Sequence, residues 1–371
     1  MRQAVIQRAT VWCMAFILLG TFAPASGEPK KANRQNFQYL AGEIQIPLAR
    51  EDEPVRATVS ADKALAYLEA GAVAWQRERG CISCHTNGTY LFARPALTDH
   101  FGPPAATVRT FFERKLVAYE KEDTDYLPAE VVYLAAGLAA DDAHVNKALT
   151  EPTRRALHKL FAKQDDDGAW KWPACWPPLE DSRYHGATVA AMAVATAPGY
   201  LEDISDPAEK QGLEKLTRFL RTTKPANPYE KMLLLWAGSR FTDLIDAERK
   251  KQLIADTLAA QRPDGGWSLR TSGTWDVRRK RLDAEPDREN PPSDGHATGL
   301  AITVLREAGV SADHKQVRRG VGWLKTNQRR SGRWWTRSLN TDKYSFITYS
   351  GTAYSLLALH ACDELPTAAS E

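Results

Sequence analysis

Gln261-Arg262-Pro263-Asp264-Gly265-Gly266-Trp267 is one of three copies of the pattern Q-x-x-x-G-x-W in this 371-residue chain. The other two copies span residues 164–170 and 328–334. Each copy ends a segment with apolar residues three and four positions apart, which predicts an amphipathic helix with one charged face. A loop and then a nearly all-apolar, Ala-rich segment follow, which predicts a helix buried between neighbours. Recurrence of this kind predicts an architecture built from repeated helix pairs.

Three less regular pairs complete the series. Outer helices are predicted at 61–79, 107–121 and 207–222 in addition to the three that end on the pattern. The inner helices are predicted at 88–97, 127–139, 186–196, 228–238, 295–308 and 351–361. Six outer and six inner helices in alternation predict an all-α fold, an (α/α)6 toroid over residues 61–365. The alternative is an open array such as a TPR-like solenoid, whose repeats are shorter and more uniform.

The recurring pattern resembles the QW motif of squalene–hopene cyclases and related triterpene cyclases, over roughly residues 60–362. Protein prenyltransferase β-subunits share the same barrel. The resemblance implies a terpenoid cyclase-like toroid and an isoprenoid-like or other apolar small molecule as its ligand. The chain lacks the D-x-D-D motif with which those cyclases protonate an alkene, since Asp165-Asp166-Asp167 lies within a QW turn. A cyclase-like reaction would therefore need Asp181 or Asp294 as its acid.

The first 27 residues have the pattern of a secretory signal peptide. The basic residues Arg2 and Arg8 precede an apolar run from Ala9 to Phe22, and the small residues Ala23-Pro24-Ala25 follow it. The alternative, a membrane anchor, is disfavoured because the run is short for a hydrocarbon core of about 30 Å. We therefore expect an exported, periplasmic or extracellular protein that does not span a membrane after cleavage. Residues 28–60 are expected to form an irregular lead-in to the toroid.

The charge balance excludes one broad class of partner. The formal net charge of +3 falls to about +1 once Arg2 and Arg8 are removed with the signal peptide. Near-neutrality gives no electrostatic basis for binding nucleic acid, so none is expected as a partner.

Gly80-Cys81-Ile82-Ser83-Cys84-His85 stands where the first repeat should have its QW turn. The spacing C-x-x-C-H is the attachment signature of c-type haem, in which both thiols join the porphyrin and the histidine binds iron. Three other interpretations remain open. Cys81 and Cys84 could form a redox disulfide, could bind zinc with His85 and a further ligand, or could act as a structural staple.

The repeat register places further polar residues at the starts of the inner helices. Because inner helices of a closed barrel run parallel, these residues are expected at one mouth of the toroid. The set comprises His85, His185 and His296 as metal or haem ligands and Asp181, Asp294 and Tyr349 as catalytic candidates. The competing interpretation is that Asp294 and Tyr349 are helix caps or rim hydrogen bonders.

These observations give three functional hypotheses. The first is an exported c-type haem toroid that acts in redox or apolar-ligand chemistry with a redox partner protein. The second is a non-catalytic binding or scaffold module with zinc or a disulfide at Cys81 and Cys84, and the third is the cyclase-like enzyme. Cys175 and Cys362 are expected to be unpaired, with Cys362 buried. The long loop 268–293, with the basic run 278–281, is either a lid or a solvated insertion.

Overall fold

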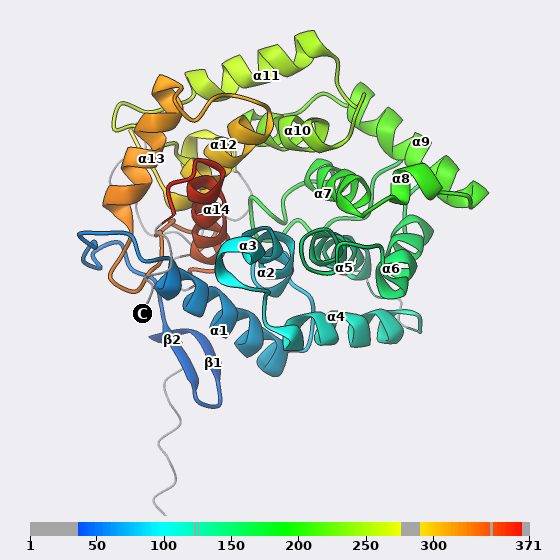
Figure 1. The fold of residues 1–371 in the computed structure, drawn as a ribbon, viewed down its shortest axis with the longest axis horizontal. Coiled ribbons are helices and arrows are strands. Elements are labelled where there is room, and N and C mark those ends of the chain that lie inside the picture. The colour runs from blue at the N-terminus through cyan, green and yellow to red at the C-terminus, as the bar shows by residue number, and fades with distance from the viewer. Residues whose placement is uncertain (1–35, 122–123, 125, 276–289, 342–343, 366–371) are drawn as a thin grey trace, which may run out of the picture. The chain divides into compact units, whose positions relative to one another are not determined.

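The computed structural model describes residues 36–121, 124, 126–275, 290–341 and 344–365. Two concentric layers of helices alternate along this part of the chain (Figure 1). The outer layer consists of α1 (Ala61–Arg79), α4 (Ala106–Tyr119), α6 (Glu151–Ala162), α9 (Pro207–Thr222), α11 (Ala247–Ala259) and α13 (Lys315–Asn327). The inner layer consists of α2 (Asn87–Ala93), α5 (Leu127–Asp141), α7 (Arg183–Thr196), α10 (Pro228–Arg240), α12 (Gly295–Glu307) and α14 (Ile347–Ala361). The predicted (α/α)6 toroid is confirmed.

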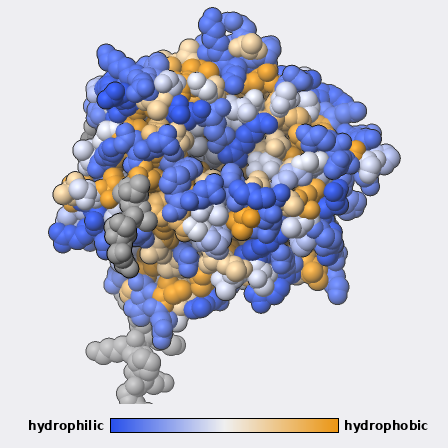
Figure 2. Space-filling view, viewed as in Figure 1, coloured by the Kyte–Doolittle hydropathy of each residue, from blue (hydrophilic) through white to orange (hydrophobic). Residues whose placement is uncertain are grey.

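Short elements join these helices. They are η2 (Arg94–Leu97), α3 (Thr98–Phe101), a π-helical turn η3 (Asp142–Asn146), α8 (Tyr200–Asp203) and η4 (Leu269–Thr271). None of the described helices combines the length and apolar character that crossing a bilayer requires. On the face seen in Figure 2, hydrophobic residues form separate patches between hydrophilic ones.

The inner helices form a closed ring. Each contacts the next in chain order, and α14 contacts α2. Their burial follows from composition: every residue of α2 and all but one of α5 are buried. The outer helices instead bury one face, as in α9, where Gly212, Leu216 and Leu220 are buried at a helical spacing.

The QW turns bind successive outer helices together. In the first copy, Gln164 Nε2 donates to Gly168 O at 3.0 Å within the turn and to Gly212 O of α9 at 3.0 Å. The Trp170 Nε1–H donates back to Leu160 O of α6 at 2.8 Å. Gly168 has a φ of +97°, and a Cβ there would lie 2.2 Å from Lys215 O. The pattern thus requires Gly because of both its backbone angle and the closeness of the next helix.

The third copy closes the barrel with the same contacts. Gln328 Nε2 donates to Gly332 O at 2.9 Å and to Ser60 O at 2.9 Å, while Ser60 N donates to Gln328 Oε1 at 2.7 Å. A Cβ at Gly332, with a φ of +90°, would meet the backbone of Lys63 in α1 at 2.6 Å. The last outer helix therefore joins the first one as α6 joins α9.

The lead-in 28–60 is not wholly irregular, which corrects that expectation. β1 (Phe37–Ala41) pairs antiparallel with β2 (Ile44–Pro47). Gly42 has a φ of +60° and allows the tight turn between them. Tyr39 is 1% exposed, so the hairpin is held to the toroid by burying this ring.

Candidate functional site

Side chains from the first turns of α7, α10 and α12 form a chain of buried ring contacts that continues to Tyr354, midway along α14. His185 stacks on Tyr229 with centroids 6.0 Å apart, and Tyr229 lies 6.0 Å from the ring of His296. The His296 ring lies 5.1 Å from that of Tyr354 on α14. His185 and His296, two of the six residues expected at one mouth, therefore lie on either side of Tyr229, and their role as metal or haem ligands stays a prediction.

The two imidazoles are each held by one ring nitrogen. His185 Nε2 lies 2.8 Å from the Tyr133 hydroxyl, and His296 Nδ1 lies 3.0 Å from Ser350 Oγ. Their second nitrogens, His185 Nδ1 and His296 Nε2, are buried without a hydrogen-bond partner. Such an arrangement is typical of histidines whose remaining nitrogen faces a ligand or an ordered water.

His85 lies beside the C-x-x-C segment and contacts a different set of rings. Its imidazole stacks on Phe346 at 4.7 Å and 11° and meets Trp75 edge-on at 4.7 Å. His85 Nδ1 lies 2.8 Å from Thr86 Oγ1, and Thr86 in turn bonds Tyr39 of the hairpin at 2.9 Å. The ring is thereby oriented through Nδ1, which leaves Nε2 as the nitrogen for a metal.

The C-x-x-C segment is fixed by side chains of the inner helices. Asn87 accepts from Ser83 N at 2.8 Å and donates to Cys81 O at 3.0 Å, and Glu130 accepts from Ile82 N at 3.1 Å. The Cys84 thiol donates to Glu180 Oε1 at 2.9 Å. Burial raises the pKa of the Cys84 thiol well above its usual range, and the carboxylate of Glu180 adds to the shift.

Within the described residues, no cysteine is in a disulfide. Cys362 is 8% exposed, so the prediction that it is unpaired and buried is confirmed, and Cys175 is likewise not in a disulfide. A disulfide between Cys81 and Cys84 is not present in the structure.

The two predicted acids differ in their surroundings. Asp294 caps α12 and accepts from Ala297 N at 2.9 Å and Leu269 N at 2.5 Å, and burial raises its pKa to about 6. The Asp294 carboxylate therefore caps the helix, which was the competing interpretation to a catalytic role. Asp181 is half-buried in the turn before α7, and burial raises the pKa of this carboxyl, with Glu230 as a second cause.

Tyr349 does not join the other residues at the mouth, which corrects its predicted position. Its hydroxyl donates to Leu68 O of α1, and its ring packs on Tyr39 and Tyr67 at 5.9 and 5.5 Å. Tyr349 therefore fills the space between the inner and outer layers. The register identified the correct turn of α14 but not the face on which Tyr349 lies.

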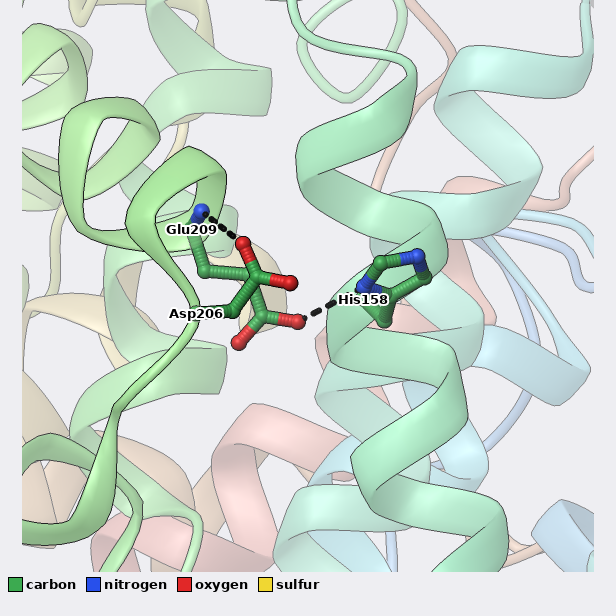
Figure 3. Close-up of side chains that lie close together, drawn as sticks. All are labelled: His158, Asp206 and Glu209. Carbon is green, nitrogen blue, oxygen red and sulfur yellow. Dashed lines mark hydrogen bonds and ion pairs between the residues drawn. The ribbon is translucent and has the colours of Figure 1, made fainter.

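A group of three potential metal ligands lies on the outer wall and was missed by the sequence analysis. The ligand atoms of His158, Asp206 and Glu209 lie within 4.8 Å of one another (Figure 3). Among the described residues, no other group of three or more His, Cys, Asp or Glu side chains lies this close together. His158 Nδ1 lies 2.9 Å from Glu209 Oε1, and Tyr200 donates to Glu209 Oε2 at 2.9 Å. These bonds already satisfy the Glu209 carboxylate, so the group serves as a clamp between α6 and α9.

Comparison with known proteins supports the architecture. No protein-family model and no curated protein matches the sequence. Among solved structures, a polysaccharide lyase is 11% identical, with 81% of this chain and 96% of that chain covered and a TM-score of 0.52. A glycosidase in complex with glucose is 12% identical, with coverages of 82% and 97% and a TM-score of 0.50. The chain has an α/α-toroid fold.

A terpene cyclase is also among the similar structures. The type II terpene cyclase MstE from Scytonema, in complex with merosterolic acid A, is 16% identical, with coverages of 82% and 99% and a TM-score of 0.44. At these identities the similarities concern the toroid fold and not its chemistry.

The burial of the three imidazoles predicts a specific response to pH. Burial lowers the pKa of His85, His185 and His296 to about 3 in each case. Below the ordinary histidine pKa of about 6.5, the three imidazoles bind protons in the unfolded chain but stay neutral in the folded toroid. Stability is therefore expected to fall as the pH drops below about 6.5, by roughly 1.4 kcal/mol for each imidazole at one pH unit below.

Nuclear magnetic resonance of the histidine ring protons tests this expectation. The three buried imidazoles should not titrate between pH 8 and 5. Titration of the buried rings with midpoints near 6.5 would contradict the burial described here. Asp294 acts in the opposite sense, because its raised pKa makes the folded state take up a proton as the pH falls through about 6.

Proposed function

We propose that the chain is an exported redox protein that carries a c-type haem attached to Cys81 and Cys84, with His85 as a ligand of the iron. The observation that carries the proposal is the C-x-x-C-H segment with two thiols outside any disulfide and an imidazole oriented by Thr86. When bound, such a haem supplies one-electron transfer.

The residues of the segment suit this group in three respects. His85 is held neutral by burial, as an iron ligand must be, and its Nδ1 is already occupied by Thr86. The backbone between the cysteines is fixed by Asn87 and Glu130, so the two thiols have defined positions. Aromatic side chains cover the imidazole, which gives the apolar surroundings that a flat macrocycle favours.

A series of rings connects His85 with the surface and supports exchange of electrons with a partner protein. His85 stacks on Phe346, and Phe346 stacks on Tyr344 with centroids 5.4 Å apart and 8° between the planes. Tyr344 is 43% exposed, and Trp176 packs edge-on against it at 5.9 Å. A redox partner docking on Tyr344 would thus lie two ring contacts from His85.

Glu180 contacts the unattached Cys84 thiol. It accepts a hydrogen bond from that thiol in the structure, a bond that would be lost on thioether formation, and burial raises the pKa of its carboxyl. The elevated pKa of Cys84 makes the folded thiol a poor nucleophile, because the thiolate is the reactive form. Attachment would therefore have to precede closure of the barrel around Cys84.

Absorbance spectroscopy after export in cells that possess haem-attachment machinery tests the proposal. The wild-type protein should show a Soret band that survives unfolding and acid–acetone extraction. The double variant Cys81→Ser/Cys84→Ser should lose the band completely, whereas Cys175→Ser, a cysteine outside the motif, should retain it. His85→Ala should keep the covalent band with an altered ferric spectrum. A wild-type band that acid–acetone removes would overturn the proposal.

A further inference from the structure

Two histidine rings are in contact where the first and last repeats meet. His360 lies in the last turn of α14, and His100 lies in α3, which follows α2 and η2 along the chain. Their ring centroids are 4.8 Å apart, with 83° between the planes. The pair therefore spans the seam, by which we mean the contact of α14 with α2 and η2 that closes the inner ring.

His360 leaves one of its ring nitrogens unused. Its Nδ1 atom is buried and has no hydrogen-bond partner among the described residues. Native structures rarely leave a buried polar atom unpaired, and a bound ion or water is a common reason when they do. His100 is exposed, so its ring can turn about its side-chain bonds and direct a nitrogen to the same place.

The charges around His360 favour a cation. Burial and then the neighbouring His100 lower the pKa of His360, whereas Asp363 and Asp99 act in the opposite direction. Both carboxylates are exposed and lie close enough to act on this imidazole. The dipole of α14 adds partial negative charge at its C-terminal end. Arg306, the guanidinium at this helix end, donates to two backbone carbonyl groups and is not among the groups that shift this pKa.

A third histidine near the seam has different surroundings. His144, in the π-helical turn η3, lies within electrostatic reach of Asp99. Burial, Arg240 and Lys147 lower the pKa of His144, in that order, and outweigh the effect of Asp99 and Glu307. Because two cations face His144, we do not include it with the pair.

Imidazole nitrogens and carboxylate oxygens are ligands that Zn²⁺ favours. We propose that His100 and His360 bind a Zn²⁺ ion at the seam, with a carboxylate of Asp99 or Asp363 and water completing its coordination. The two imidazoles are already in contact, whereas a carboxylate has to turn toward the ion, so three ligand atoms do not lie together here beforehand. A bound ion would join the first repeat to the last one.

Calorimetric titration of the exported protein with Zn²⁺ measures the site directly. His360→Gln and His100→Gln should each weaken Zn²⁺ binding by at least about tenfold, since even the loss of a residue that only orients a metal ligand costs this much. His100 is exposed, so His100→Gln tests the site if His360→Gln disturbs the fold. The double variant Asp99→Asn/Asp363→Asn should weaken binding by about threefold or more, because it removes both carboxylates.

Two other groups in this chain could take up zinc, and each has its own control. His158→Gln removes the exposed histidine of the outer-wall group and should leave the affinity of the seam unchanged. Cys81→Ser/Cys84→Ser removes both thiols of the C-x-x-C-H segment and should leave it unchanged as well. The zinc proposal thus stands apart from the haem proposal, and loss of haem and loss of zinc binding are distinguishable results.

Thermal unfolding gives a second measurement. At a free Zn²⁺ concentration of about a hundred times its Kd, the melting temperature of the wild type should rise by about 3–6 °C, because the ion binds only the closed seam. The His100→Gln protein should show no such rise.

Three results would overturn the proposal. One is the absence of saturable heat with Zn²⁺, and another is wild-type affinity in both His100→Gln and His360→Gln. The third is zinc binding that His158→Gln or Cys81→Ser/Cys84→Ser abolishes, because the metal would then lie away from the seam.

Discussion

Gln328→Ala is expected to lower the free energy of unfolding by about 2–4 kcal/mol, because loss of the Gln328 hydrogen bonds leaves buried backbone groups without partners. Gln328 is fully buried and links three backbone groups, Ser60 N, Ser60 O and Gly332 O. Two of these groups precede the first outer helix, so the substitution acts where the last repeat meets the first. Urea unfolding followed by circular dichroism measures the change.

Gln164→Ala supplies the matched control. Gln164 makes the corresponding bonds to Gly168 O and Gly212 O between two repeats in the middle of the chain. In a closed barrel the two substitutions should have similar costs, with Gln328→Ala the larger because it also loses the bond from Ser60 N. In an open array Gln328 would lie at a solvated end, and its replacement would change stability by less than about 0.5 kcal/mol. That smaller result would contradict closure of the ring.

Gly299→Ala should destabilise the protein by about 1–3 kcal/mol, although alanine is the better helix former. A Cβ at Gly299 in α12 would lie 2.5 Å from Ser355 N and 2.5 Å from the Tyr354 carbonyl carbon of α14. Both neighbours are backbone atoms that cannot rotate away, so the two inner helices would have to separate. Thermal unfolding of the variant measures the loss.

Gly322→Ala tests the same change where space is free. Gly322 lies inside α13, and a Cβ there would meet nothing within 4 Å. Alanine should therefore stabilise the protein at this position by about 0.5–1 kcal/mol. Destabilisation by both substitutions to a similar extent would show that helix packing at Gly299 is not the cause.

The toroid was predictable because one local pattern performs the same physical task in each copy. Gln164, Gln261 and Gln328 each donate to the glycine carbonyl four residues later. Gln164 and Gln261 also donate to the next outer helix, and Gln328 donates to Ser60, the N-cap of α1. Trp170, Trp267 and Trp334 each donate to a carbonyl ten residues back. A side chain with so many fixed partners tolerates little change in sequence, which makes the repeat recognisable.

The candidate site was predictable only in part. The start of each inner helix could be counted from the repeat register, and this placed His185 and His296 near one another. The face on which a residue lies could not be predicted for a buried helix. These helices carry apolar residues on every face, so their sequence pattern does not distinguish one face from another. For this reason Tyr349 was assigned to the mouth, although it packs on α1.

Other features depend on contacts between distant segments. The bond from Cys84 to Glu180 and the His158–Glu209 pair join residues that no local pattern relates. The β-hairpin was missed because its strands have five and four residues and carry little periodic signal. The predicted signal peptide 1–27 and the basic run 278–281 lie outside the described residues.

Intact-mass spectrometry of the exported, unfolded protein tests the covalent haem most directly. The wild-type chain should carry the added mass of one haem, and the Cys81→Ser/Cys84→Ser chain from the same cells should have the mass of the bare polypeptide. A wild-type chain that has the bare mass, although a control cytochrome made in the same cells carries its haem, would contradict the account.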